Sequence, residues 1–90
     1  MGSKEVWKRL SEQTDVTALP RQSVVEIGGD RRVLIEEHFG VQEYSRDTIT
    51  VKVRYGCVTV CGGDLELTRM TREQVVICGR IDAVTLHRRG

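Results

Sequence analysis

The order of apolar and polar residues along the chain predicts a series of short β-strands. Residues 32–54 read RVLIEEHFGVQEYSRDTITVKVR, which contains an apolar strand, a polar run, a glycine and a strand with an apolar residue at every second position. Side chains of a strand alternate between the two faces of a sheet, so Ile49, Val51 and Val53 share one face. This face is expected to be buried.

The same alternation recurs from residue 23 to residue 86, with turn signals between the apolar runs. A tight hairpin turn is expected at Gly28-Gly29-Asp30, because glycine and aspartate accept positive φ angles. Gly62-Gly63-Asp64 is expected to be another turn, and Gly79 a turn or a bulge. Leu65 and Leu67 are expected on a buried face. The spacing predicts an all-β fold of about eight short strands, an antiparallel meander that is either sandwich-like or barrel-like. Stacked β-rungs are the alternative.

Residues 1–18 are expected to form a short N-terminal helix and a connection to the β domain. Ser3 can cap the helix, while Val6, Trp7 and Leu10 form a thin apolar stripe. Two interpretations of this stripe stay open: it packs on an open end of the β core, or it contacts a protein partner. The β domain is expected over residues 19–87, followed by a basic tail over residues 88–90.

Composition narrows the function classes. The chain has 90 residues, 39% hydrophobic and 30% charged, which suits one globular domain. No apolar run approaches the roughly 20 residues of a membrane helix, and the N-terminus lacks the apolar region of a signal peptide. We therefore expect a cytoplasmic protein that does not insert into membranes. The net charge of +1 disfavours nucleic acid as a partner.

The soft metal ligands of the chain are Cys57, Cys61, Cys78, His38 and His87. Two of the cysteines lie on one predicted strand, about 13 Å apart at roughly 3.3 Å per residue, so they can share neither a metal ion nor a disulfide. An odd number of cysteines in an intracellular chain favours free thiols. No metal site and no cofactor is expected.

Glu36 and His38 raise the possibility of acid–base chemistry, since a carboxylate beside an imidazole is a common catalytic pair. No nucleophile is recognisable nearby. We favour the interpretation that both residues hydrogen-bond turn backbone near Gly40. A small metal- or thiol-dependent enzyme using Glu36, His38 and a cysteine is the alternative.

Open sheets expose strand edges that proteins must protect. The run 74–78 carries no charge and no proline, so it is the predicted interface strand of a closed homo-oligomer.

The segment 35–44, IEEHFGVQEY, carries a recognisable motif. It is similar to the pattern I-E-N-H-x-G-I followed by a tyrosine, with Glu37 where asparagine is usual. The matching residues are Ile35, Glu36, His38, Gly40, Val41 and Tyr44. Further matches are Leu19, Pro20, Ile49, Val51, Gly56, Val60, Gly62, Leu65, Leu67, Val76, Gly79 and Ile81. On these residues the chain resembles the YabP/YqfC family of sporulation proteins, and the YqfC branch more than the YabP branch.

The resemblance implies a non-enzymatic protein made in the mother cell during endospore formation. It implies a structural or assembly role through protein–protein contacts, with a YqfD-like membrane protein as the partner that brings it to a membrane. The motif residues would then be structural or interaction residues. They are Ile35, Glu36, His38, Gly40, Tyr44, Gly56, Leu65 and Gly79.

Overall fold

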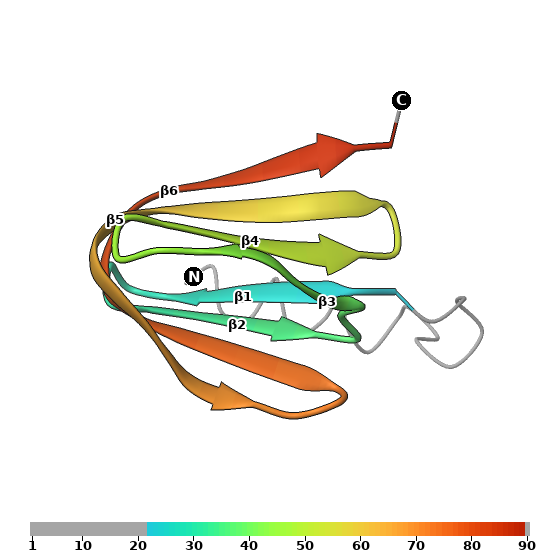
Figure 1. Cartoon of the computed structure of the whole chain (residues 1–90), viewed down its shortest axis with the longest axis horizontal. Helices are drawn as coiled ribbons and strands as arrows, with labels where there is room; N and C mark the ends of the chain where they lie inside the picture. Colours follow the sequence, from blue (N-terminus) through green and yellow to red (C-terminus); the bar gives the residue numbers. More distant parts are fainter. Residues whose placement is uncertain (1–21, 90) are drawn as a thin grey trace, which may run out of the picture.

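The structure, a computed structural model, describes residues 22–89. Six antiparallel strands form one open sheet in the order β1-β2-β6-β5-β4-β3 (Figure 1). The strands are β1 (Val24–Gly28), β2 (Arg32–Glu36), β3 (Gly40–Tyr44), β4 (Thr48–Val53), β5 (Gly56–Met70) and β6 (Gln74–Arg88). The predicted all-β antiparallel fold class is confirmed. The helix expected within residues 1–18 lies outside the described residues.

The number of strands differs from the prediction because β5 and β6 are each 15 residues long. The runs expected as separate strands on either side of Gly62-Gly63 are the two halves of β5, and those on either side of Gly79 are the two halves of β6. The ladder continues across the glycines, with Gly62 opposite Ile81 and Gly63 opposite Arg80. These glycines therefore bend two paired strands together, and the turn predicted at Gly62-Gly63-Asp64 is wrong.

Close backbone approach explains why glycine is needed at the bend. A Cβ on Gly62 would overlap the carbonyl oxygen of Arg80. Two hairpin turns also hydrogen-bond to the bend: the Gly62 N–H donates to the carbonyl of Asp47 at 3.1 Å, and the Gly79 N–H donates to the carbonyl of Arg31 at 3.1 Å. The bend is thus fixed by a hairpin turn from each of the two halves of the sheet, one between β3 and β4 and one between β1 and β2.

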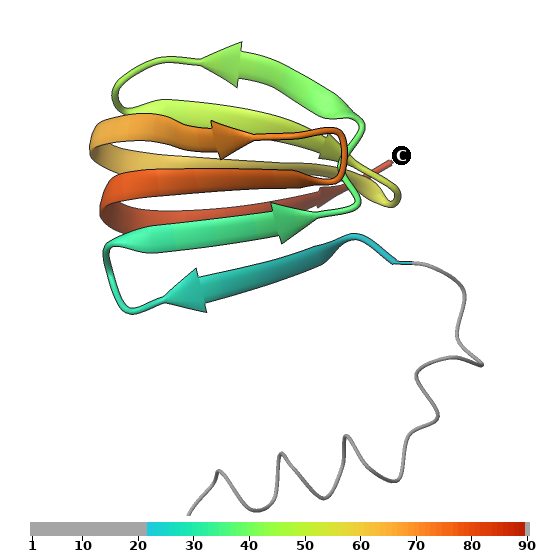
Figure 2. The ribbon, with the colours of Figure 1, turned by 90° about the horizontal axis from the view of Figure 1, so that it is seen from below.

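The bend folds the single sheet into two facing layers (Figures 1 and 2). One layer consists of the second half of β6, the first half of β5, β4 and β3. The other consists of β1, β2, the first half of β6 and the second half of β5. Of the architectures considered from the sequence, the sandwich-like one is therefore observed.

The core lies between the two layers and consists of side chains from alternate positions of the facing strands. The predicted burial of Ile49, Val51 and Val53 is confirmed, since each is 0% exposed. Leu65 is fully buried, whereas Leu67 is half-buried at the margin of the core. The ten fully buried apolar residues are Val33, Ile35, Ile49, Val51, Val53, Val58, Val60, Leu65, Val75 and Ile77.

The sheet departs from a simple meander at β2, which pairs with β1 and β6 and not with β3. Residues 37–39 instead carry the chain from one layer to the other, and we call them the crossover. The bend closes one end of the sandwich, and the crossover spans the opposite end (Figure 1).

The strand edges also differ from the prediction. The run 74–78 is the first half of β6, and it pairs with β2 on one side and with the second half of β5 on the other. It is a central strand of its layer, so its backbone groups are used within the sheet. The prediction that it is an exposed edge strand is therefore wrong, because local sequence does not reveal which strands have two neighbours; the homo-oligomer stays a prediction.

Candidate functional site

His38 lies in the crossover and is 9% exposed. Its Nε2 atom is 2.7 Å from the carbonyl oxygen of Thr71, and its Nδ1 atom accepts a hydrogen bond from the Gly40 N–H at 3.0 Å. A carbonyl only accepts and a backbone N–H only donates, so the proton of the neutral imidazole is on Nε2. Both ring nitrogens are therefore occupied by backbone groups. The predicted bond between His38 and backbone near Gly40 is confirmed, whereas the one predicted for Glu36 is not found among the described residues.

Further hydrogen bonds join the crossover to three other segments. Ser23 donates its hydroxyl to the Glu37 carbonyl at 2.6 Å and accepts the Arg54 N–H at 3.0 Å. The Glu37 N–H donates to the carbonyl of Glu73 at 2.7 Å. The crossover is thus tied to the start of β1, the end of β4 and the turn between β5 and β6. This network holds the second end of the sandwich closed.

Glu37 adopts a φ angle of 59°, in the left-handed region that most residues with a side chain avoid. Asparagine is among the residues that adopt this conformation most readily. The asparagine usual at this position of the family motif is therefore explained by the backbone of the crossover. Glu37 adopts this conformation with a side chain that is less suited to it than asparagine.

The remaining motif residues are separated in the structure. Ile35 and Leu65 are core residues, whereas Glu36 and Tyr44 are exposed on β2 and at the end of β3. Gly40 has a φ angle of 123° beside the crossover.

Two motif glycines allow close contacts between strands. A Cβ on Gly56 would overlap the carbonyl oxygen of His87, and one on Gly79 would lie 2.5 Å from the carbonyl oxygen of Asp64. The motif residues therefore do not converge on one cleft. Ile35 and Leu65 lie in the core, Gly79 at the bend, and His38 and Gly40 in or beside the crossover, whereas the other motif residues lie elsewhere. The possible contact residues Val6, Trp7 and Leu10 lie outside the described residues.

The residues named for an enzymatic alternative are not brought together. Glu36 is exposed opposite Val24 and Gln74, on the outer face of its layer. Cys57 and Cys61 are free and half-buried on β5, facing away from the core. Cys78 is likewise free and half-buried on β6, where its Sγ atom is 3.5 Å from the hydroxyl of Thr68. Within residues 22–89, no group of three or more histidine, cysteine, aspartate or glutamate residues is placed to hold a metal ion.

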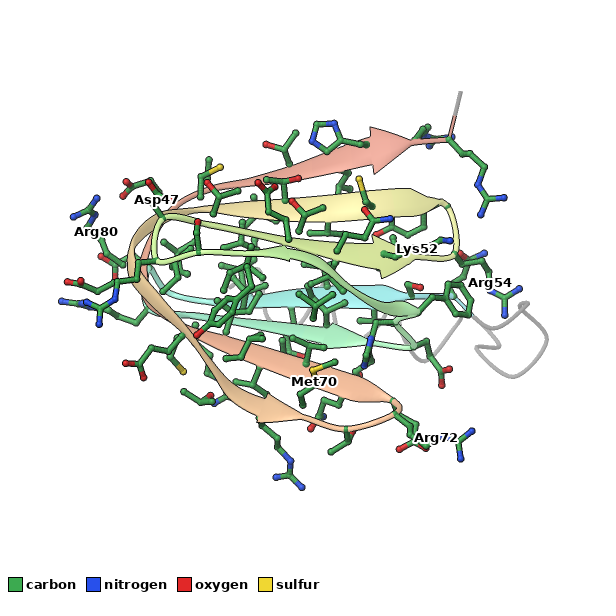
Figure 3. The ribbon with its side chains drawn as sticks, viewed as in Figure 1. Asp47, Lys52, Arg54, Met70, Arg72 and Arg80 are labelled. Carbon is green, nitrogen blue, oxygen red and sulfur yellow. The ribbon has the colours of Figure 1, made fainter. Side chains whose placement is uncertain are left out.

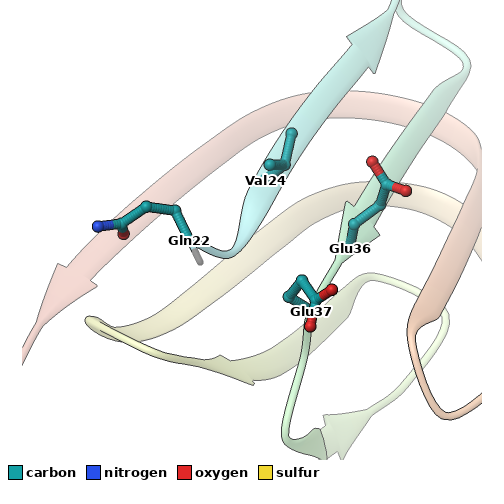
Figure 4. A pocket seen from close by; sticks show the side chains of 4 residues that line it. All are labelled: Gln22, Val24, Glu36 and Glu37. Carbon is teal, nitrogen blue, oxygen red and sulfur yellow. The ribbon is translucent and has the colours of Figure 1, made fainter. Parts of the chain in front are cut away.

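Two shallow depressions are present on the described surface. One has a volume of about 210 Å³ and lies beside β1 and β2; Figure 4 shows its lining side chains, Gln22, Val24, Glu36 and Glu37. Sites for small organic ligands usually enclose about 300–1,000 Å³. The acidic side chains border this depression without converging on a common point (Figure 4).

The other depression has a volume of about 270 Å³ and a basic lining. Its lining residues are Gln42, Lys52, Gly56, Cys57, His87, Arg88 and Arg89. Lys52, Cys57 and His87 form one row across three strands, because Cys57 is opposite both of the others. Figure 3 shows Lys52 and Arg54 at the end of the sandwich away from Asp47 and Arg80. Sequence reasoning missed this cluster, since nothing local indicates that Lys52 lies near the C-terminal basic residues.

At the bend, an exposed ion pair joins Arg80 and Asp82 at 3.1 Å. The hydrogen bond and charge of Asp82 raise the pKa of Arg80, so its guanidinium stays cationic. The pair lies in solvent, where such pairs contribute little to stability.

The geometry defines a small all-β domain in which some of the motif residues lie at the two ends of a folded sheet. The model of the YabP family matches residues 20–90, and the protein belongs to the YabP family. This membership indicates a sporulation-related protein; the YqfC-like branch stays a prediction. No match was found among the curated proteins or among the solved structures. Within the described part of the chain, no helix is long and apolar enough to cross a membrane.

Proposed function

We propose that this protein is a non-enzymatic sporulation protein, a structural or assembly module that acts through protein–protein contacts. The observation that carries the proposal is the state of His38, the residue of the motif best suited to catalysis. Both of its ring nitrogens are engaged by backbone groups, at 2.7 Å and 3.0 Å. A general base needs a free nitrogen within reach of a substrate.

The surface of the sandwich supports binding to another protein. Each layer ends in strands with one unpaired side among the described residues, and such edges accept an added strand. The proposed partner is a YqfD-like membrane protein, which would hold this protein at a membrane from the mother-cell cytoplasm. The stripe of Val6, Trp7 and Leu10 is the second proposed contact, since aromatic residues are enriched at the centres of interfaces.

A pull-down from sporulating cells tests this function. The bait is the folded full-length protein, compared with a variant carrying Trp7→Ala and Leu10→Ala. We expect the wild type to recover the YqfD-like protein. Loss of recovery in the double variant assigns the contact to the apolar stripe, while retention assigns it to a strand edge. The proposal fails if the wild type recovers no membrane protein, or if deletion of the gene leaves spore formation intact.

A separate measurement addresses the enzymatic alternative. Elemental analysis of the purified protein is expected to find no stoichiometric metal. One equivalent of zinc bound through His38 or a cysteine would contradict the non-enzymatic assignment.

A further inference from the structure

The second half of β6, residues 81–88, is an exposed edge strand. It pairs with the first half of β5 on one side, whereas β2 pairs only with residues 74–78 of β6. On its other side the Ile81 N–H donates to the carbonyl of Asp30 at 2.8 Å, and nothing among the described residues pairs there with residues 82–88. Figure 1 shows this half of β6 as the outermost strand of its layer. Leu86, near its end, is 57% exposed.

The backbone direction along this edge follows from one hydrogen bond. The Arg89 N–H donates to the Tyr55 carbonyl at 2.9 Å, so Arg89 directs its N–H group toward β5. In an antiparallel ladder, successive residues direct their N–H and C=O groups alternately to the two sides. The N–H and C=O groups of Val84, Leu86 and Arg88 therefore point away from β5. They are free to pair with another strand.

The middle of this edge is less protected than the other edges of the sandwich, whereas Asp82, beside a register shift, and Arg88 lie at its two ends. The edge strand β1 carries Glu26, and β3 carries Glu43 next to a register shift. The second half of β5 carries Glu66 and Arg69 and also has a register shift. Residues 83–86 read AVTL, without charge or proline, and they pair with β5 in regular register. Charges and bulges are the usual devices that prevent edge pairing.

We infer that this edge is the site where two copies of the protein pair, through antiparallel contact of residues 82–88 with the same residues of the second copy. The two-fold axis passes between the two Thr85 residues. Each Val84 then lies opposite the second copy's Leu86. Asp82 is the extra residue of the register shift beside Gly62, so it lies at the end of the paired stretch, where its exposed carboxylate meets the second copy's Arg88.

The side chains select this register. Across the interface, residues whose N–H and C=O groups face outward must lie opposite one another to form hydrogen bonds. The two strands can therefore shift relative to each other only by two residues at a time. A step in one direction places the two Val84 residues opposite each other and moves Asp82 away from the second copy's Arg88. A step in the other direction places Val84 opposite that arginine. The proposed register alone pairs two apolar side chains between two ion pairs, and cross-strand pairs of both kinds are favourable.

The ion pair between Asp82 and Arg80 within one copy does not prevent this arrangement. Arg80 contacts both carboxylate oxygens of Asp82 at 3.1 Å, but the two side chains are 60% and 55% exposed. A carboxylate has about four acceptor positions, so Asp82 can accept a further hydrogen bond from Arg88 of the second copy. Pairing also extends the apolar inner face that Val84 shares with Val60.

The mass of the purified full-length protein across a concentration series provides the first test. Sedimentation velocity is expected to show conversion from 10.2 kDa to twice that mass. Asp82→Arg alone and Arg88→Asp alone each place like charges opposite one another, and each should weaken the dimer about tenfold or more. The double variant exchanges the charges and should restore the dimer. A wild-type protein that stays monomeric at high concentration overturns the inference. This holds also if the edge is covered by the protein's own N-terminal segment.

Cross-linking tests the register. In a background with Cys57, Cys61 and Cys78 changed to serine, Thr85→Cys should form a disulfide-linked dimer, because the two residues face each other across the axis. Ala83→Cys is the matched control, since it lies on the same face of the same strand. Its counterpart in the second copy is four residues away along the pairing, about 13 Å, too far for a disulfide. Equal cross-linking at residue 83, or none at residue 85, overturns the proposed register and with it the proposed interface.

The inference deepens the proposed assembly role, but its test is independent of that role. A dimer that binds no membrane partner would contradict the proposed function and leave the β6 interface standing. A monomer that binds the membrane partner would do the opposite.

Discussion

Replacing His38 tests directly whether the family motif is architectural. His38→Ala removes the hydrogen bonds to the Thr71 carbonyl and from the Gly40 N–H. Each contributes about 1 kcal/mol net, and unsatisfied partner groups add to the cost. Thr71 is exposed, so water can replace its bond. The lost packing of a ring that is only 9% exposed adds a further part. We expect a loss of about 3 kcal/mol in the free energy of unfolding, out of a total of about 5–13 kcal/mol for a domain of this size.

Two substitutions that each keep one hydrogen bond of His38 separate the contributions of the two bonds to stability. His38→Asn keeps an acceptor near the position of Nδ1, and His38→Gln can place a donor near the position of Nε2, so each should retain one of the two bonds. Each is expected to cost about 1–2 kcal/mol. Glu36→Gln is the matched control within the same motif, and its exposed side chain predicts a change within about 0.5 kcal/mol.

Thermal unfolding followed by circular dichroism measures the series. A loss of about 3 kcal/mol should lower the Tm by about 12–24 °C. An unchanged Tm for His38→Ala would refute the structural role of the ring. So would a Glu36→Gln variant that is destabilised as much as the histidine variants.

Three further substitutions test the bend, the crossover and the core. Gly62→Ala should cost about 3 kcal/mol or more, because its Cβ meets a backbone carbonyl that cannot move aside. Gly28→Ala is the control, since its Cβ would make only an ordinary contact of 3.7 Å, and equal stability of the two variants in urea would contradict the role of the bend. Glu37→Asn should stabilise the protein by about 0.5–1 kcal/mol in the same titration, because asparagine adopts a φ angle of 59° at a lower cost than glutamate. A loss of stability would show that backbone strain is not decisive at this position. Val51→Asp introduces an unpaired charge at a fully buried site and should abolish the cooperative unfolding transition, so a retained transition would place Val51 outside the core.

The local sequence determined which face of each strand is buried. The alternation at Ile49, Val51 and Val53 placed these residues in the core, because a period of two fixes the side-chain direction in any strand. The hairpin at Gly28-Gly29-Asp30 was equally predictable, since Gly29 has a φ angle of 59° that favours glycine. The part played by His38 was half predictable: its bond with Gly40 is local, whereas its bond with Thr71 joins residues 33 positions apart.

The tertiary structure decided whether a glycine ends a strand or bends it. The sequence around Gly62 and Gly79 does not differ from the sequence expected around a glycine in a turn. The two glycines bend β5 and β6 because the ladder continues past them and because the Asp47 and Arg31 carbonyls accept their N–H groups. The order of strands also depended on these distant contacts, since the bend places the first half of β6 beside β2 and leaves the second half at an edge. Alternation specifies a face for each strand but not its neighbours, which depend on how the whole sheet closes around one core.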